Sequence, residues 1–154
     1  MKRQRAAEAR AAAAPADDDY LLEAQVGHRL RRAHQRASAV FMNHFAELQL
    51  TPTQYAALVK IRDEGEVSQN YLGRLTAMDP ATMKGVIDRL EKRGLIASKP
   101  DPKDRRRTLW RLTAAAEKLL VPAIEAGRAV TEETLAPLSP EERTTFLDLL
   151  GRLT

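Results

Sequence analysis

The sequence predicts a mainly α-helical fold with one small β-hairpin. Several stretches repeat apolar residues at three- and four-residue steps, which is the period of an amphipathic helix. Two short β-compatible segments, residues 95–99 and 108–112, enclose a run of prolines, aspartates and arginines that is typical of a hairpin tip. With 154 residues, the chain suits one domain or one subunit of an oligomer.

The first third of the chain is predicted to contain a tail and one long helix. Residues 1–17 are basic, rich in alanine and without apolar periodicity, so we expect a disordered tail. Residues 18–49 then carry apolar side chains at helical spacing from Leu22 to Leu48, over about seven turns. Because such a helix is too long to be buried against one small core, it is expected to span a subunit or to meet a partner.

Three helices are predicted next, each opened by a capping side chain. Thr51 caps the first, Ser68 caps a short second helix over residues 69–77, and Asp79 caps the third. A proline follows Thr51 and Asp79 directly, at the helix position where a missing N–H costs nothing. The third helix ends near Gly94. Its apolar side chains share one face, at the spacing i, i+3, i+4 and i+7: Met83, Val86, Ile87 and Leu90.

Two more helices are predicted after the hairpin. Thr113 caps a long helix that reaches about residue 135 and is expected to be interrupted near Pro122. Ser139, with Glu142 three residues later, opens a last helix through a capping box. The order of helix, short helix, helix and basic hairpin is that of a winged helix-turn-helix, whose second helix enters the DNA major groove.

The charge distribution supports this prediction. The net charge is +4, but the 79–111 segment alone holds ten Lys and Arg against five Asp and Glu, so the rest of the chain sums to −1. Residues 112–154 hold four basic and seven acidic residues, a net charge of −3. A local basic excess of this kind favours a surface that binds a polyanion. A basic surface that is merely solvated is the alternative.

Several classes of protein are excluded or disfavoured by composition. The chain has no cysteine, so a disulfide scaffold, a thiol switch and a zinc ribbon are impossible. No apolar run approaches the ~18 residues of a membrane-spanning helix. His44 and Glu47 are one His–carboxylate pair at the spacing i, i+3, but the sequence contains no second pair that could complete a catalytic or metal site. It also contains no glycine-rich loop of the kind that binds phosphate. We therefore expect a soluble cytoplasmic protein that is not an enzyme and needs no cofactor or metal.

Three motifs, in order, resemble the MarR (multiple antibiotic resistance regulator) family: residues 50–55 (LTPTQY), 88–96 (DRLEKRGLI) and 101–106 (DPKDRR). The resemblance extends over roughly residues 20–153. It implies a bacterial, nucleoid-associated transcription regulator that binds a palindromic double-stranded DNA operator as a homodimer. Residues 18–49 and 113–154 would then be dimerisation helices, and residues 50–112 the winged helix-turn-helix domain.

The resemblance also implies DNA contacts from the third helix and from the hairpin. Arg106 corresponds to the arginine that enters the minor groove, and Asp104 to the acid that orients it. Many members carry an arginine where this chain has Gly85, so Lys84 is expected to take over part of the guanine reading. Asp88 and Arg89 can instead pair with each other across the helix surface. The complete set of expected contacts is Ser68, Ala81, Thr82, Lys84, Gly85, Asp88, Arg89, Asp104, Arg105, Arg106 and Arg107.

Members of this family commonly release DNA when a small aromatic anion binds, so the hypothesis is a ligand-responsive repressor. The segment 68–82 resembles the branch associated with aromatic-acid catabolism, including nicotinate-pathway regulators. Side chains able to meet a small aromatic carboxylate, if they do not face water or the dimer interface, are His28, Arg32, His34, His44 and Tyr55. The alternatives are an architectural DNA-binding protein without sequence preference or effector, and a winged-helix module that binds protein.

Overall fold

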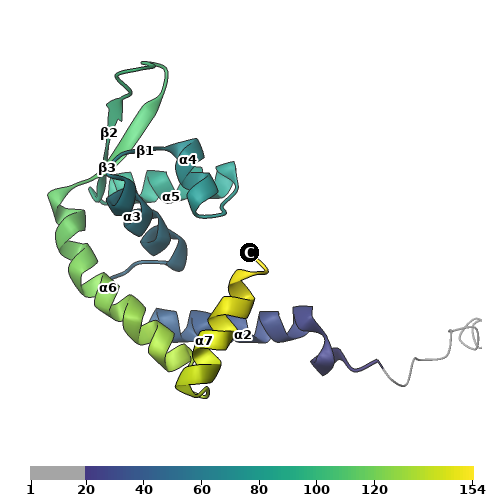
Figure 1. The fold of residues 1–154 in the computed structure, drawn as a ribbon. Helices are drawn as coiled ribbons and strands as arrows, with labels where there is room; N and C mark the ends of the chain where they lie inside the picture. Colours follow the sequence, from purple (N-terminus) through teal and green to yellow (C-terminus); the bar gives the residue numbers. More distant parts are fainter. Residues whose placement is uncertain (1–19) are drawn as a thin grey trace, which may run out of the picture. The chain divides into compact units, whose positions relative to one another are not determined.

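The computed structural model describes residues 20–154, and the chain divides into two compact units, Met1–Gln35 and Arg36–Thr154. The tail expected over residues 1–17 lies outside the described residues. Figure 1 labels the helices and strands along the chain. In order, they are η1 (Leu22–Ala24), α2 (Val26–His44), α3 (Pro52–Glu64), β1 (Val67–Ser68), α4 (Gln69–Leu75), α5 (Pro80–Lys92), β2 (Ile96–Pro100), β3 (Thr108–Leu112), α6 (Ala114–Thr134) and α7 (Pro140–Gly151).

The N-terminal helix is shorter than the sequence predicts. Gln25 has an extended backbone (φ −74°, ψ 133°), which separates the 3-10 turn η1 from α2. The helix α2 then has 19 residues, about five turns, and ends at His44. At the end of the following turn, Gln49 adopts a left-handed backbone (φ 53°) and donates its N–H to the carbonyl of Phe45. The prediction of one helix through Leu48 is therefore wrong, because the chain reverses there.

The predicted helix starts are confirmed by the structure. The Thr51 hydroxyl accepts the N–H of Gln54 at 3.3 Å, and the Gln54 side chain accepts the N–H of Thr51 at 3.1 Å. Ser139 forms the same reciprocal pair with Glu142, and the hydroxyls of Ser68 and Thr113 each accept one N–H from the first turn of their helices. These caps satisfy N–H groups that have no partner inside the helix, so short polar side chains set where each helix begins.

The core lies in the unit Arg36–Thr154 and is formed mainly by α3, α5 and the strands. The four apolar residues predicted on one face of α5 are all at most 2% exposed. Phe45, Leu58 and Ile61 are buried with them, as is Trp110 of β3. The outer face of α5 is left free of core contacts.

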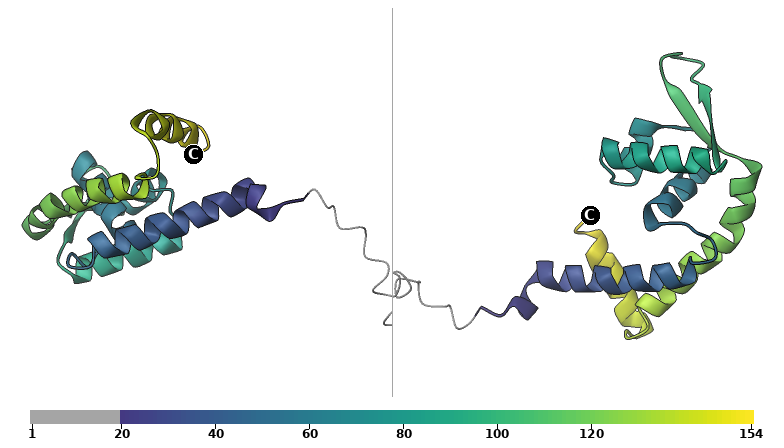
Figure 2. Two further views of the ribbon diagram at one scale, coloured as in Figure 1. Left: turned by 90° about the horizontal axis from the view of Figure 1, so that it is seen from below. Right: turned by 180° about the vertical axis from the view of Figure 1, so that it is seen from behind.

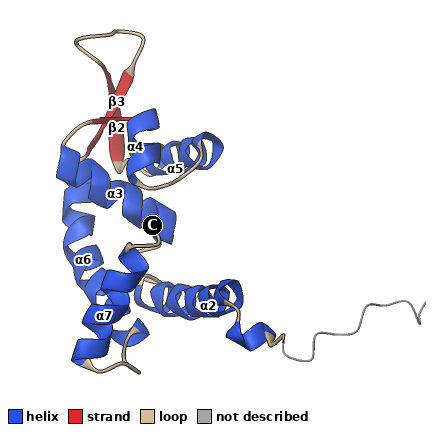
Figure 3. Cartoon of the chain, turned by 45° about the vertical axis from the view of Figure 1, so that its right-hand side comes forward, coloured by secondary structure: helices blue, strands red, loops and turns tan. Residues whose placement is uncertain are grey.

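The strands form a small antiparallel sheet with the order β1-β3-β2. The hairpin of β2 and β3 agrees with the prediction, apart from a shift of one residue in β2. β1 was not predicted, because two residues are too few to show an alternating pattern. It pairs Val67 with Trp110 and Ser68 with Leu109, which places the start of α4 beside the hairpin. Figure 3 shows the three strands together, with the loop of the hairpin extending past the helices.

The helix α6 continues through Pro122, so the expected interruption is absent. Both Pro122 and Lys118, whose carbonyl would bond to the missing N–H, are exposed. Water can therefore satisfy that carbonyl, and the helix tolerates the proline on its outer side. No helix in residues 20–154 is long and apolar enough to cross a membrane.

The end of α5 is fastened to the elements on either side of it. The Arg93 guanidinium donates to the carbonyls of Gln49 at 2.7 Å and Leu48 at 3.4 Å. Gly94 follows with the positive φ (68°) of a helix C-terminus, as predicted. Its carbonyl accepts the hydroxyl of Thr113, which caps α6, at 2.7 Å. The turn after α2, the end of α5 and the start of α6 thus form one hydrogen-bonded junction.

Candidate nucleic-acid interface

The N-terminus of α5 is held by the carboxylate of Asp79. It accepts the N–H groups of Ala81 at 3.0 Å and Thr82 at 2.9 Å, and the Thr82 hydroxyl at 2.6 Å. These hydrogen bonds, the one from the Thr82 side chain above all, hold the pKa of Asp79 below its usual value. Ala81 and Thr82 are themselves exposed, so the first turn of α5 is accessible to a large ligand.

The outer face of α5 carries two charged side chains that are paired and one that is not. The Lys84 ammonium contacts both carboxylate oxygens of Asp88, at 2.8 and 3.1 Å. The expected pairing of Asp88 with Arg89 is therefore wrong, because residues four apart face each other on a helix and adjacent residues do not. The Arg89 guanidinium lies instead over Gly85: its Nη2 atom is 3.3 Å from the position that a Cβ would take there.

The tip of the hairpin is organised by Asp104. Its carboxylate accepts both the backbone N–H and the Nε–H of Arg106, each at 3.1 Å. The side-chain hydrogen bond from Arg106 is the main cause that lowers the pKa of Asp104. The Arg106 side chain is nevertheless 92% exposed, so it is oriented at its base and free to contact another molecule.

A second acid supports the neighbouring arginine. The carboxylate of Asp101, a buried residue, lies 3.6 Å from the Nε atom of Arg107 and accepts the N–H of Lys103 at 2.8 Å. The N–H of Asp101 bonds to the carbonyl of Arg107 at 2.9 Å, which closes the loop. Arg105 is exposed beside them, and no hydrogen bond or ion pair joins its side chain to the rest of residues 20–154. Two aspartates therefore fix the loop that presents three consecutive arginines.

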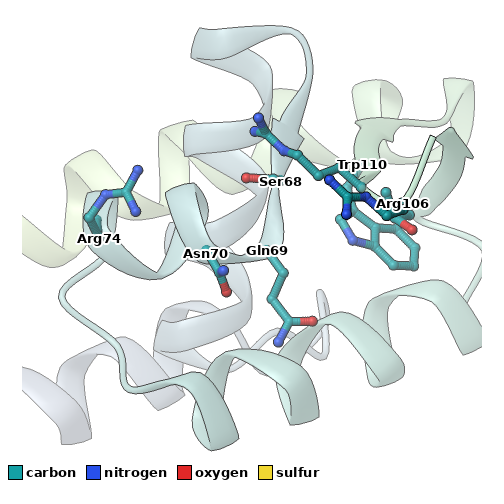
Figure 4. Close-up of a pocket in the computed structure, with 8 residues that line it drawn as sticks. Ser68, Gln69, Asn70, Arg74, Arg106 and Trp110 are labelled. Atoms are coloured by element: carbon teal, nitrogen blue, oxygen red, sulfur yellow. The ribbon is translucent and has the colours of Figure 1, made fainter. Parts of the chain in front are cut away.

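A groove of about 610 Å³ lies between α4 and the hairpin. Figure 4 shows Arg74 at one side of it and Arg106 with Trp110 at the other. Its lining residues are Ser68, Gln69, Asn70, Arg74, Arg106, Arg107, Thr108 and Trp110. A second hollow, of about 390 Å³ between α4 and α5, shares three of these residues: Gln69, Asn70 and Arg74. The two hollows therefore adjoin each other along α4, and the basic side chains Arg74, Arg106 and Arg107 line the first of them. Figure 2 shows the hairpin extending beyond both helices.

Sequence reasoning missed five residues of this groove: Gln69, Asn70, Arg74, Thr108 and Trp110. Gln69 and Asn70 directly follow the predicted cap at Ser68, and this position at a helix start was the only local signal that could have indicated them. Nothing local indicated that the hairpin lies beside α4, since this follows from the pairing of β1 with β3. Ser68, which was predicted both as a cap and as a DNA contact, acts in the structure as a helix cap, because its hydroxyl accepts the N–H of Tyr71 at 3.4 Å.

The candidate effector residues fall into two separate groups. His28 and Arg32 line a pocket of about 390 Å³ in the unit Met1–Gln35, together with Glu23 and Arg29. His34 belongs to the same unit and is exposed. The remaining two candidates, His44 and Tyr55, belong to the unit Arg36–Thr154.

Tyr55 lies in a cluster of three aromatic rings. Phe41 and Phe45 are stacked with 3.9 Å between ring centroids, and the Tyr55 ring meets Phe45 edge-on at 4.9 Å. The Tyr55 hydroxyl lies so close to Gly127 of α6 that no side chain would fit there. Burial raises the pKa of Tyr55, and the positive charges of Arg62 and Arg128 lower it to a smaller extent.

His44 is occupied by a partner in α6. Its Nε2 atom lies 2.7 Å from a carboxylate oxygen of Glu133. The Arg36 guanidinium donates to the carbonyls of Glu133 at 3.1 Å and Thr134 at 3.3 Å. These contacts fasten α2 to the end of α6. Within residues 20–154, the structure contains no group of three or more His, Asp or Glu side chains placed to hold a metal ion.

Comparison with known proteins places this architecture among transcription regulators. Residues 50–108 match the profile of the MarR family. The chain is 39% identical to the HTH-type transcriptional repressor NicR of Pseudomonas putida over 141 residues, which cover 91% of this chain and 89% of that protein. The similar proteins found in this comparison are named as transcriptional regulators, and no name among them describes an enzyme.

Solved structures agree with this result. A probable transcriptional regulator from Pseudomonas aeruginosa superposes with a TM-score of 0.83 at 48% identity, over 87% of this chain and all of that one. Bordetella bronchiseptica BpsR superposes with a TM-score of 0.84 at 38% identity, over 87% of this chain and 96% of that one. That structure concerns the regulation of the DNA binding of BpsR by 6-hydroxynicotinic acid.

Proposed function

The chain belongs to the MarR family of transcription regulators, and from this premise we propose that it is a repressor that a small aromatic acid releases from a palindromic operator. One observation carries the proposal: a groove whose lining includes Arg74, Arg106 and Arg107 lies between α4 and the arginine hairpin, and a second hollow beside α4 reaches the start of α5. This arrangement suits duplex DNA, since a helix fits the major groove and a basic hairpin reaches the adjacent backbone or minor groove.

The hairpin supplies the contact with the strongest support. Arginine is favoured in narrow minor grooves, where the potential is most negative. Arg106 has the required exposure, and its hydrogen bonds to Asp104 reduce the freedom that it would lose on binding. Arg105 and Arg107 would then contact phosphates on either side, and Gln69, Asn70 and Arg74 would contact the backbone beside α4.

The homodimer is supported by surfaces that one chain leaves uncovered. The helix α7 buries none of its residues, while Phe146, Leu147 and Leu149 are 39–51% exposed. In the proposed homodimer, a second copy covers these side chains. Residues 18–49 and 113–154 are the two segments of each copy that are expected to form the interface. Two α5 helices spaced by one turn of DNA, about 34–36 Å, would then read the two halves of a palindrome.

The effector is proposed to bind beside the aromatic cluster. Phe41, Phe45 and Tyr55 offer ring faces and edges to a flat ligand, and Arg62 and Arg128 supply positive charge near the Tyr55 hydroxyl. The relative BpsR responds to 6-hydroxynicotinic acid, which has this chemistry. The dimer would have two states, one whose α5 helices match the spacing of the operator and one whose α5 helices do not. A ligand that binds the second state more tightly lowers the affinity for the operator by the difference between its two binding free energies.

The proposal is tested with a gel-shift assay on the upstream region of the gene, with random duplex as competitor. We expect a specific complex that weakens steeply as salt concentration rises, because phosphate contacts release counterions. Arg106→Ala should weaken it strongly while the dimer stays intact, and Lys118→Ala, which removes an exposed charge from α6, should not. Equal affinity for random duplex would instead support an architectural DNA-binding protein.

The effector is tested in the same assay with a panel of aromatic acids that includes 6-hydroxynicotinic acid. We expect at least one acid to dissociate the complex, and Tyr55→Phe to shift the concentration needed without changing operator affinity in its absence. If no acid in the panel acts, the aromatic-acid part of the proposal is rejected and the DNA-binding part still stands.

A further inference from the structure

The outer face of α5 must read bases if this chain recognises an operator, so the availability of its side chains decides which residue does it. The face carries Thr82, Lys84, Asp88 and Arg89 around Gly85. The Thr82 hydroxyl is bonded to Asp79 at 2.6 Å, and the Lys84 ammonium contacts both oxygens of Asp88. The Thr82 hydroxyl and two of the three Lys84 donors are therefore engaged within the helix.

Arg89 differs from its neighbours on this face. It is exposed, and no hydrogen bond or ion pair joins its side chain to any other part of residues 20–154. All of its guanidinium donors remain available for a ligand. Arginine can bond to the O6 and N7 atoms of guanine with two parallel donors, which is the commonest base-specific contact.

The position of the Arg89 guanidinium depends on Gly85. A Cβ at residue 85 would lie 3.3 Å from Nη2, 3.8 Å from Cζ and 3.9 Å from Nη1 of Arg89. The whole guanidinium therefore lies against the bare backbone one turn before its own Cα. Helical side chains lean toward the N-terminus of the helix, so a residue four positions later is the one that covers this site.

We propose that Arg89, positioned over Gly85, is the guanine-reading side chain of α5. The glycine leaves the helix surface open, and the arginine from the next turn fills the place that a side chain at position 85 would take. The proposal differs from the expectation that Lys84 replaces the missing reader, because Lys84 is paired with Asp88 and its ammonium lacks the planar fork of two parallel donors that a guanidinium presents. It rests on the proposed function, since it assumes that α5 lies in the major groove.

The test is a selection of binding sites from a random duplex library, using the full-length protein and its variants. The wild-type protein should select a motif that contains a guanine in each half-site. Arg89→Lys keeps the charge and loses the two-donor fork, so it should reduce the preference for that guanine by about 5- to 150-fold. Its affinity for random duplex should change by less than about twofold, because phosphate contacts do not depend on sequence.

Gly85→Ala separates base reading from stability. Replacing a glycine inside a helix with alanine favours the helix, so the melting temperature should rise. The new methyl group would lie 3.3 Å from Nη2, so the guanidinium must shift by a few tenths of an ångström and the guanine preference should fall nevertheless. Lys92→Ala, which removes an exposed charge from the last turn of the same helix, is the matched control and should leave the motif unchanged.

Three outcomes would overturn the proposal. An unchanged motif in Arg89→Lys shows that another side chain reads the guanine, and loss of the guanine in Lys84→Ala alone assigns it to Lys84. Equal losses on selected and random duplex make Arg89 a phosphate contact. If the wild-type protein selects no motif at all, the proposed function fails instead, so the two failures are distinguishable.

Discussion

The helices α5 and α7 begin in the same way but differ in how much of their surface is buried. Each starts with a capping side chain, Asp79 or Ser139, followed at once by a proline, and they have 13 and 12 residues. Yet α5 buries four apolar side chains completely, and α7 buries none. The end of α5 is also fastened by Arg93 and Thr113, whereas polar contacts such as that of Arg143 with Glu132 join α7 to the end of α6.

The difference teaches which parts of the proposed repressor are complete within one chain. The helix α5 packs its apolar face within one chain, and its outer face is the surface proposed to read DNA. The helix α7 exposes Phe146 and Leu149, and in the proposed homodimer a second chain covers them. DNA reading and dimerisation are therefore separable by mutation, and the following substitutions test this separation.

Leu90→Ala should have the largest effect. Leu90 is completely buried, so its truncation should lower the free energy of unfolding by about 2–5 kcal/mol through lost contacts and a cavity. Urea denaturation followed by circular dichroism measures this loss. The matched change in α7, Leu149→Ala, removes a side chain that is 51% exposed and should cost the fold of one protomer far less. Similar losses for both variants would contradict the distinction between the two helices.

The double variant Phe146→Ala with Leu149→Ala should act next, on the dimer. Burial of one such side chain contributes roughly 1.5–3 kcal/mol, and 1.4 kcal/mol is a tenfold change in affinity, so the dimer dissociation constant should rise at least about tenfold. Sedimentation equilibrium at several protein concentrations measures this constant. Lys92→Ala, which removes an exposed charge outside residues 18–49 and 113–154, is the control. A dissociation constant unchanged in the double variant would show that this face of α7 is not the interface.

Ser139→Ala should have a smaller effect, of about 1 kcal/mol, because it removes one helix cap. The Ser139 hydroxyl accepts the N–H of Glu142 at 3.3 Å in an exposed position, so no cavity forms when it is removed. Thermal unfolding of the dimer at fixed protein concentration measures the change. Ser139→Asp, which keeps an N-cap acceptor, should restore most of the lost stability.

The smallest expected effect is that of Asp79→Asn, and it depends on pH. Asparagine also caps helices well, so stability near pH 7 should change little. In the native protein the pKa of Asp79 lies below its ordinary value of 3.8, so its stabilising contribution is complete above about pH 4 and is lost as the pH falls through the lowered pKa. Melting temperatures between pH 2 and 7 should therefore fall more steeply for the wild-type protein than for Asp79→Asn. Parallel curves would show that this cap does not titrate as described.

Most of the fold was predictable, because the signals for it are local. Helix starts at Thr51, Asp79 and Ser139 depend on side chains within three residues, and the buried face of α5 follows from spacing alone. The predictions failed at the break at Gln25 and at the continuity of α6 through Pro122. The break at Gln25 is a change of backbone conformation that no proline or glycine in the sequence indicates. The continuity of α6 through Pro122 depends on which side of the helix faces solvent.

The candidate DNA surface was predicted in outline, and the structure adds the partners of its side chains. The motif that contains Asp104 and Arg106 indicated their pairing, which is local. The residues of α4 that line the groove with Trp110 were not identified, because a two-residue strand brings the hairpin and α4 together. The effector candidates were chosen by residue type, and the structure divides them between two units of the chain.

The sequence by itself determined the capped helices, the hairpin with its arginine tip and the basic segment of net charge +5 between Asp79 and Arg111. Each of these depends on interactions between residues close together in the chain. Only the tertiary structure decided that α4 joins the hairpin in one groove, and that α5 buries four apolar side chains while α7 buries none. Burial depends on which distant surfaces meet, and local periodicity does not contain that information.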